Sequence, residues 1–217
     1  MAGYCMVNVK EGDLVRMEYT GTIASSGTVF DTTDESIARK AGIYDASSMY
    51  GPKIAVFGNR MIIRGLEEAI AKVELGKAEQ FSIGPQKAFG EKQKSLVRMM
   101  PYREFAKQGV EPVSGMTLGL DGVPARVKSV TSGRVVVDFN HPLAGEAVVY
   151  TLKVNEVISE DGKKLEAMLP MLEVKGKVSQ QGSGFLVEFE KSQPSEKVEA
   201  AKRALLSVVP GAAFSIA

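Results

Sequence analysis

The residue types that usually perform covalent catalysis are sparse in this chain. His141 is the only histidine and Cys5 the only cysteine among 217 residues, so neither a histidine-rich metal site nor an intrachain disulfide can form. The sequence contains no P-loop and no nucleophile-elbow motif. Asp31 precedes two threonines and could simply cap a helix. The common covalent and nucleotide chemistries therefore lack their motifs, and we expect no metal and no cofactor.

Composition excludes further classes of partner. The 27 Lys and Arg residues nearly balance the 26 Asp and Glu residues, for a net charge of +1, so no global field draws the chain to nucleic acid or membrane. A single cysteine suits a reducing compartment, and no apolar run approaches the ~18 residues that span a bilayer. We expect a soluble cytoplasmic protein with one or two real cores.

Five segments carry aromatic and aliphatic residues in a fixed order. Taken singly, Phe30 and Tyr150 would ordinarily be core residues, and Ile62 and Ile63 could be a buried strand end. Together, however, the segments resemble the SlyD-like FKBP-type prolyl isomerases, over roughly residues 7–158. The matching segments are 17–21, 29–33, 62–68, 87–90 and 135–150.

The resemblance implies a set of functional residues. Those with catalytic roles would be Tyr19, Phe30, Asp31, Ile63, Phe89 and Tyr150. Those that contact substrate would be Ile62, Leu66, His141 and Leu143 in the isomerase fold, and Met99, Met100 and Phe105 in an inserted module. Phe30, Leu66 and Tyr150 would form floor and walls, and the backbone N–H of Ile63 would hold the peptide carbonyl before the proline.

The activity implied is rotation about the bond that precedes proline. That rotation has a barrier of about 20 kcal/mol, and it needs neither proton transfer nor a covalent intermediate. An apolar pocket that excludes water, with one donor aimed at the twisted imide, is the expected form of catalyst. Two departures weaken the match, since many relatives have Trp in place of Leu66 and Tyr in place of Phe89. We expect modest activity on short peptides.

Periodicity predicts the fold of this region independently. Residues 14–20, 53–57, 79–83 and 148–157 read as strands, and a short helix over 34–41 follows a Thr33 cap. An apolar stripe at Leu66, Ala69, Ile70 and Val73 predicts one amphipathic helix that ends by Gly76. These elements predict an α+β fold, and the resemblance implies an antiparallel sheet half-wrapped around the helix.

Residues 94–137 resemble the insert-in-flap chaperone domain of that family. Pro101 opens a helix over 102–108, and strands are expected near 116–120, 125–130 and 134–139. Methionines suit a surface that accepts varied sequences, although they could equally fill the module's own core. We expect Phe105 and Val110 inside and the methionines partly outside. A net charge of +4 over 91–137 leaves an RNA- or ribosome-binding adaptor as an alternative.

Residues 159–217 form a third region, expected to be a ββαβ-like accessory domain. Strands are expected over 173–179, 185–190 and 213–216, with a helix that starts at Pro194. Acids and bases balance at eight each, so no electrostatic partner is indicated. So small a unit leaves an edge or a face exposed. A homodimer through this domain is favoured over docking on the isomerase domain.

The sequence thus predicts three domains: residues 1–93 with 138–158, the insert at 94–137, and 159–217. The predicted function is prolyl isomerisation of unfolded or partly folded polypeptide clients, with chaperone activity from the insert. A holdase with a vestigial pocket is the second hypothesis. Macrolide inhibitors are candidate ligands by resemblance; no membrane partner is expected, and nucleic acid is disfavoured.

Overall fold

The computed structural model describes residues 7–120 and 122–216. Cys5, on which the disulfide argument rested, lies outside this range, and so does Asp121. By contacts the chain divides into two compact units: one takes in the chain up to Ile83 and again from Ala147 onward, and the other is Gly84–Glu146. None of the helices in the described residues combines the length and apolar character that a membrane crossing requires.

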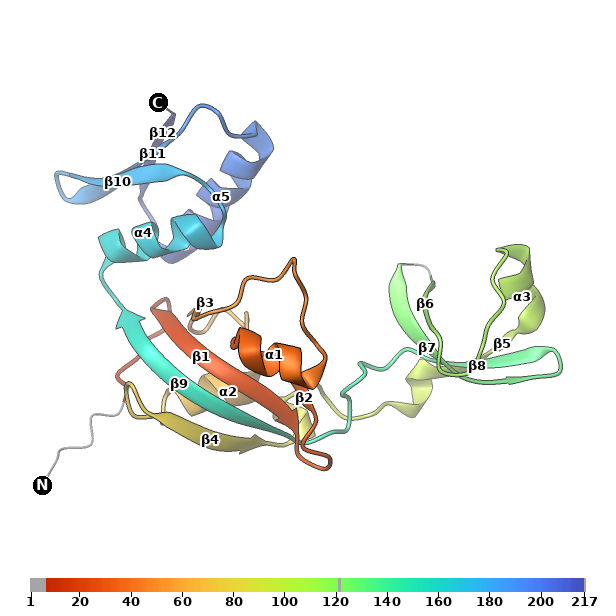
Figure 1. Cartoon of the computed structure of the whole chain (residues 1–217). Helices are drawn as coiled ribbons and strands as arrows, with labels where there is room; N and C mark the ends of the chain where they lie inside the picture. The colour runs from red at the N-terminus through yellow and green to blue at the C-terminus, as the bar shows by residue number, and fades with distance from the viewer. Residues whose placement is uncertain (1–6, 121, 217) are drawn as a thin grey trace, which may run out of the picture. The chain divides into compact units, whose positions relative to one another are not determined.

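The first unit is built on an antiparallel sheet in the order β2-β1-β9-β4, with β3 also paired to β1 (Figure 1). Its strands are β1 (Leu14–Ile23), β2 (Val29–Thr32), β3 (Lys53–Val56), β4 (Ala78–Ile83) and β9 (Val148–Ile158). The β1–β9 ladder runs from Leu14 opposite Ile158 to Ile23 opposite Val148. Chain segments more than a hundred residues apart are thereby joined along their whole length, which confirms the predicted α+β class.

Helix α2 (Arg64–Ile70) carries the predicted apolar stripe. Leu66, Ala69 and Ile70 are buried as expected, and so is Val73. The helix itself ends earlier than predicted, at Ala71, so Val73 is buried from the following turn. A Cβ on Gly65 would lie 2.2 Å from Cγ2 of Ile83, so glycine is what allows α2 to lie this close to β4.

Helix α1 (Glu35–Ala41) begins one residue later than predicted. Its cap is Asp34, whose carboxylate accepts from the N–H groups of Ser36 at 2.7 Å and Ile37 at 3.1 Å. The prediction of Thr33 as cap was wrong, because the Thr33 hydroxyl donates instead to the backbone oxygen of Tyr19, at 3.2 Å. The helix ends at Gly42, as predicted.

The second unit, Gly84–Glu146, holds a four-stranded sheet in the order β5-β8-β7-β6. Its strands are β5 (Val97–Pro101), β6 (Thr117–Leu120), β7 (Val123–Thr131) and β8 (Arg134–Asp138), with α3 at Tyr102–Lys107 and single 3-10 turns at Pro85–Lys87 and Lys94–Leu96. Three strands and the helix match the prediction. Strand β5 was missed, since its run of Met99, Met100 and Pro101 reads as a surface segment rather than a strand.

The C-terminal segment contains α4 (Asp161–Met171), β10 (Gly176–Gln181), β11 (Gly184–Phe189), α5 (Ser195–Val208) and β12 (Ala213–Ile216). The last four match the expected ββαβ order, with β12 parallel to β11. Helix α4 was not predicted, although Leu165, Met168 and Leu169 repeat at helical spacing. Pro170, which lies within the last turn, conceals the helix in the sequence.

The C-terminal segment shares a core with the sheet of the first unit. Leu14 of β1, Val56 of β3 and Ile158 of β9 pack in one cluster with residues of α4, α5 and β11. For this reason the segment belongs to the same compact unit as the sheet. Docking of residues 159–217 on the sheet was the alternative to a homodimer, and the homodimer stays a prediction. The assignment of residues 159–217 as a separate domain also stays a prediction.

A buried ion pair lies at this joint. Nζ of Lys164 on α4 is 3.5 Å from Oδ1 of Asp13, just before β1, and the two side chains are only 9% and 6% exposed. The other carboxylate oxygen of Asp13 accepts from the backbone N–H of Lys10 at 2.9 Å. A buried pair of this kind stabilises little compared with apolar residues, but loss of one partner leaves a buried charge uncompensated.

We therefore expect Lys164→Met to destabilise the protein by about 3–5 kcal/mol, the cost of leaving the Asp13 charge buried alone. The double variant Asp13→Asn with Lys164→Met should recover most of that loss. Urea unfolding of both proteins, with the exposed Lys163→Met as matched control, measures the difference. Equal stability of the two Lys164 variants would contradict the coupling.

Candidate active site

Two tyrosines and one phenylalanine meet on one face of the sheet. Tyr19 lies opposite Leu152, and Tyr150 lies opposite Gly21, in the β1–β9 ladder, so both rings project from the same face. The centroids of Tyr19 and Tyr150 are 5.8 Å apart, and Phe30 of β2 meets Tyr150 edge-on at 5.8 Å and 83°. Three of the predicted site residues therefore form one aromatic cluster.

Gly21 makes this cluster possible. A Cβ at that position would lie 2.7 Å from Cζ of Phe30 and 3.1 Å from Cε1 of Tyr150, both closer than unstrained contacts allow. Because aromatic rings are rigid, neither could move aside without leaving the other. The glycine of the 17–21 segment thus serves the site by having no side chain.

Two threonines lock the end of β2 onto Tyr19. The backbone oxygen of Tyr19 accepts from the N–H of Thr33 at 2.9 Å and from the Thr32 hydroxyl at 3.2 Å. The backbone N–H of Tyr19 donates to the Thr33 hydroxyl at 3.0 Å. Asp31, next in the chain, is thereby held within hydrogen-bonding reach of the Tyr19 hydroxyl. Thr32 and Thr33 were not predicted as functional residues. The only feature of the sequence that points to them is their position directly after Asp31.

The electrostatics of the cluster keep both hydroxyls protonated. Burial, together with the nearby charge of Asp31 and its hydrogen bond, raises the pKa of Tyr19 far above its ordinary value of about 10. Burial and the charge of Asp31 raise the pKa of Tyr150 in the same way. The cluster therefore holds two neutral hydroxyls, of which that of Tyr19 already donates to Asp31, rather than a base or a nucleophile.

The start of α2 supplies the aliphatic part of the predicted site. Ile62 and Ile63 are half-buried and Leu66 is buried. Ile63 precedes the helix in an extended conformation, and its carbonyl accepts from the N–H groups of Leu66 at 2.9 Å and Glu67 at 3.2 Å. Within residues 7–120 and 122–216, the Ile63 N–H has no hydrogen-bond partner. Its role as a donor to substrate stays a prediction.

A hollow of about 210 Å³ opens beside Tyr19, Phe30 and Asp31. A larger hollow of about 520 Å³ is lined by Glu18 and Lys153. These two residues face each other across the β1–β9 ladder and alternate with Tyr19 and Leu152, so they lie on the opposite face of the sheet. Lys153 pairs with Glu18 at 3.4 Å. Tyr19 borders both hollows, but the smaller one also has Phe30 and Asp31 in its lining, so we take the smaller one as the candidate site. Ile63, Leu66 and Tyr150 are not among the residues that line it.

The remaining predicted pocket residues lie together in the second unit. The rings of Phe89 and His141 stack with centroids 4.5 Å apart and planes 2° from parallel. Nδ1 of His141 accepts from the backbone N–H of Leu143 at 3.1 Å, which places the proton of a neutral ring on Nε2. Phe89, His141 and Leu143 therefore form a cluster within their own unit. Their part in the pocket stays a prediction.

A polar clamp joins the two ends of the insert. The side chain of Asn140 accepts from the Gln93 N–H at 2.8 Å and donates to the Gln93 carbonyl at 3.0 Å. It also donates to Asp138 at 2.7 Å. Burial opposes ionisation of Asp138, but hydrogen bonds from Asn140 and the charge of Lys92 hold its pKa below the ordinary value. Asn140 was not predicted as important from the sequence, because a single asparagine does not indicate which backbone groups its side chain will bind.

The predicted client-binding residues of the insert separate by exposure. Met99 is 61% exposed, and Met100 is half-buried. Phe105 is only 2% exposed and lies in a core with Val127, Val135 and other residues of the sheet. The structure thus gives Phe105 a folding role, because a side chain packed on all sides cannot contact a client. Client contact by Met99 and Met100 stays a prediction.

The fold and the site define a class of protein: an antiparallel sheet packed on a helix, with a non-covalent aromatic pocket. Comparison with known families agrees. Residues 5–106 match the family described as FKBP-type peptidyl-prolyl cis-trans isomerase, and residues 98–143 match that described as FKBP26, IF domain. The chain is similar to a short-type peptidyl-prolyl cis-trans isomerase of Methanocaldococcus jannaschii, at 36% identity over 153 residues, which are 70% of this chain and 96% of the relative.

The chain belongs to the FKBP-type peptidyl-prolyl cis-trans isomerases, and within them it is SlyD-like. It is similar to the SlyD isomerase of Treponema pallidum, at 35% identity over 58% of this chain and 74% of the relative. It is also similar to the SlyD isomerase of Helicobacter pylori, at 31% identity over 52% of this chain and 62% of the relative. The predicted family and enzyme class are confirmed.

The tyrosine environment yields a pH prediction. Because the pKa values of Tyr19 and Tyr150 are raised on folding, the folded state holds these protons more tightly, and their stabilisation is present below about pH 10 and is lost as pH rises beyond it. Absorbance titration of tyrosinate should show two late-ionising residues. Tyr19→Phe and Tyr150→Phe should each remove one, and Asp31→Asn should lower the pKa of whichever remains. Ionisation of all tyrosines near pH 10 would contradict this picture.

Proposed function

We propose that this isomerase acts on unfolded or partly folded polypeptides, with the aromatic cluster as its catalytic pocket and the insert as a chaperone module. The observation that carries the proposal is the cluster of Tyr19, Phe30 and Tyr150 beside Asp31, in which apolar walls surround two protonated hydroxyls. Such a site suits a reaction in which no bond is broken and a twisted imide has to be stabilised.

The apolar walls act on solvation. The ground-state peptide is stabilised by resonance and by water on its carbonyl, and a proline ring held against Tyr150, Phe30 and Leu66 loses that water. The twisted imide has less charge separation than the planar peptide. The apolar setting therefore raises its free energy less. Burial in the pocket therefore favours the transition state over the planar ground state.

Donors act on orientation. The Ile63 N–H lies at the start of α2 and would hold the carbonyl that precedes the rotating bond. The Tyr19 hydroxyl donates its one proton to Asp31, so the Tyr150 hydroxyl, which also stays protonated, would be the second donor. Preorganised donors of this kind contribute because they need no rearrangement when the imide twists.

The insert supports chaperone activity through its exposed apolar side chains. Met99 and Val113 are each 61% exposed, Val123 is 48% and Met116 is 40%. Methionine is flexible and polarisable, so it adapts to varied client sequences. One basic side chain of the insert, Arg98, lies over its own Phe139 at 5.4 Å, so it is engaged within the module. The insert thus resembles a client-binding surface more than an RNA-binding one.

Pocket variants test the catalytic assignment. Asp31→Ala and Tyr150→Phe should each slow prolyl isomerisation by roughly tenfold, about 1.4 kcal/mol of transition-state stabilisation. Tyr150→Ala should cost at least as much but also removes a ring that is 4% exposed, so its folding must be checked by circular dichroism. The exposed Glu196→Ala on α5 is the matched control. Wild-type rates in Asp31→Ala would overturn the assignment.

Replacement of residues 94–137 by a short loop tests the insert. The clamp of Gln93 and Asn140 lies outside the deleted part, so the isomerase fold should persist. Tetrapeptide turnover should stay within a few-fold, while proline-limited refolding of an unfolded protein should slow by roughly tenfold or more, because the insert raises the local concentration of client.

Equal losses on both substrates would contradict this division of labour. Salt provides the second readout, since RNA binding weakens steeply with salt and apolar client binding does not. Inhibition of client binding by salt would favour the adaptor hypothesis instead.

A further inference from the structure

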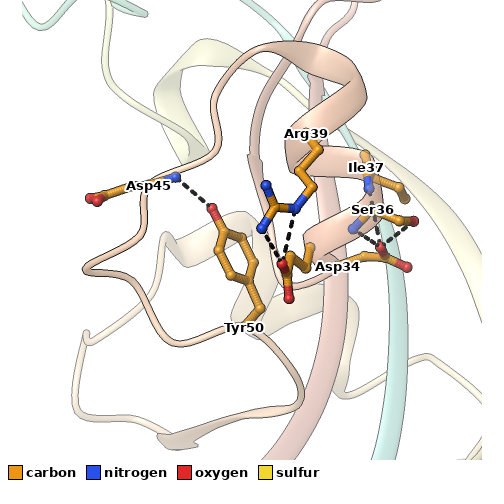
Figure 2. Close-up of polar contacts among 7 residues, drawn as sticks. Asp34, Ser36, Ile37, Arg39, Asp45 and Tyr50 are labelled. Atoms are coloured by element: carbon orange, nitrogen blue, oxygen red, sulfur yellow. Dashed lines mark hydrogen bonds and ion pairs between the residues drawn. The ribbon is translucent and has the colours of Figure 1, made fainter.

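The loop between α1 and β3, residues 42–52, is held in a fixed shape (Figure 2). The Tyr50 hydroxyl accepts from the backbone N–H of Asp45 at 3.0 Å. The ring of Tyr50 stacks on Tyr44 at 5.5 Å, and the guanidinium of Arg39 lies 3.6 Å from the Tyr44 ring centroid. Arg39 is itself anchored by two hydrogen bonds to Glu35 on α1, at 3.0 and 2.7 Å. These contacts hold the loop in one defined conformation, so residues 42–52 form a preformed wall.

This wall borders two hollows. On one side, Met49, Tyr50 and Lys53 line the 210 Å³ hollow that also contains Tyr19, Phe30 and Asp31. On the other side, the same three residues line a hollow of about 840 Å³ that extends to α4 of the C-terminal segment. The candidate catalytic pocket is therefore adjacent to a much larger groove, within one compact unit of the protein.

The groove has an apolar floor. Pro52 and Ile54 come from the loop and β3, Ile158 from β9, and Ala167, Pro170 and Met171 from α4. Met49, at the border of the two hollows, is 63% exposed. About 840 Å³ lies within the range that binds a drug-sized ligand or a short peptide. The groove exists only because α4 is docked on the sheet, so it depends on the C-terminal segment.

The charges at the margin of the groove largely cancel. Arg16 lies 3.5 Å from Glu156, and Lys163 lies 3.0 Å from Glu160. Lys53 donates to the backbone carbonyl of Met49. Glu166 adds one acid. A groove with both signs and no cluster of either favours an occupant that is apolar and weakly charged.

We propose that this groove binds an extended, apolar stretch of the same client polypeptide whose prolyl bond lies in the catalytic pocket. The proposal rests on the proposed function. A client held at Tyr19 and Phe30 must continue in both directions, at about 3.3 Å per residue, and Met49 and Tyr50 lead from the pocket to α4. Binding energy gained in the groove would then be available at the reacting bond. The C-terminal segment thereby becomes part of substrate recognition.

Matched substrates test the proposal. One prolyl tetrapeptide is compared with the same tetrapeptide extended by about six residues, on either side, with an alanine- and leucine-rich sequence or with a glycine- and serine-rich one. The full-length protein should turn over one apolar-extended peptide with kcat/KM roughly fivefold to tenfold above that of its glycine–serine counterpart.

Variants locate the preference. Pro170→Arg places a charge over the apolar floor at an exposed position of α4, and it should reduce the ratio between the two extended peptides to about one. Met49→Ser should reduce it in part. The controls are Ser179→Arg on the exposed face of β10 and Leu206→Ser on α5, which is 41% exposed; both should keep the wild-type ratio. Because the readout is a ratio, a uniform loss from poor folding does not imitate the result.

The outcomes are separable. No turnover of any peptide would overturn the proposed function itself. Turnover without preference for the apolar extension would overturn the groove alone. A photoreactive group at the end of the extension should cross-link to α4; cross-links confined to Gly84–Glu146 would instead overturn the groove in favour of the insert. A dimer that Pro170→Arg dissociates would show that a second copy, not a client, occupies the groove.

Discussion

The antiparallel pairing of β1 with β9 is the contact on which the rest of the molecule depends. Its register sets Gly21 opposite Tyr150 and so brings the aromatic rings together. At its far end it sets Leu14 opposite Ile158, which places the start of the C-terminal segment next to the start of the sheet. Because side chains alternate along a strand, a slip of β1 by one residue would turn Tyr19 to the face opposite Tyr150. One ladder thus fixes the catalytic cluster and the C-terminal joint together.

The ladder also explains how the chain accommodates two additions. The insert leaves the sheet after β4 and returns before β9, where a single amide, that of Asn140, ties the outgoing chain to the returning one. The C-terminal segment leaves from the other end of β9 and is fixed by a shared apolar core. Neither addition interrupts the pairing of β1 and β9, so the isomerase fold is retained when both are present.

The sequence was most informative where pattern and chemistry are local. Alternation located the strands of the sheet, and the stripe of Leu66, Ala69 and Ile70 located α2. Family motifs selected Tyr19, Phe30 and Tyr150, which the structure brings together, although a single aromatic residue in a strand is indistinguishable from core. Local pattern failed at Thr33, at β5 and at α4, because a tertiary hydrogen bond, a partner strand and a docking surface decided those elements. None of these leaves a trace within a short window of sequence.

The ion pair of Lys164 and Asp13 gives the joint an unusual response to heat. Removal of water from charged groups becomes less costly as temperature rises, because their hydration is entropically unfavourable, whereas the gain from apolar burial levels off. A joint that combined only apolar contacts would weaken alongside the rest of the core. With a desolvated pair at its centre, the attachment of α4 retains more of its strength near the melting temperature, so the C-terminal segment is suited to stay attached until the isomerase sheet itself unfolds.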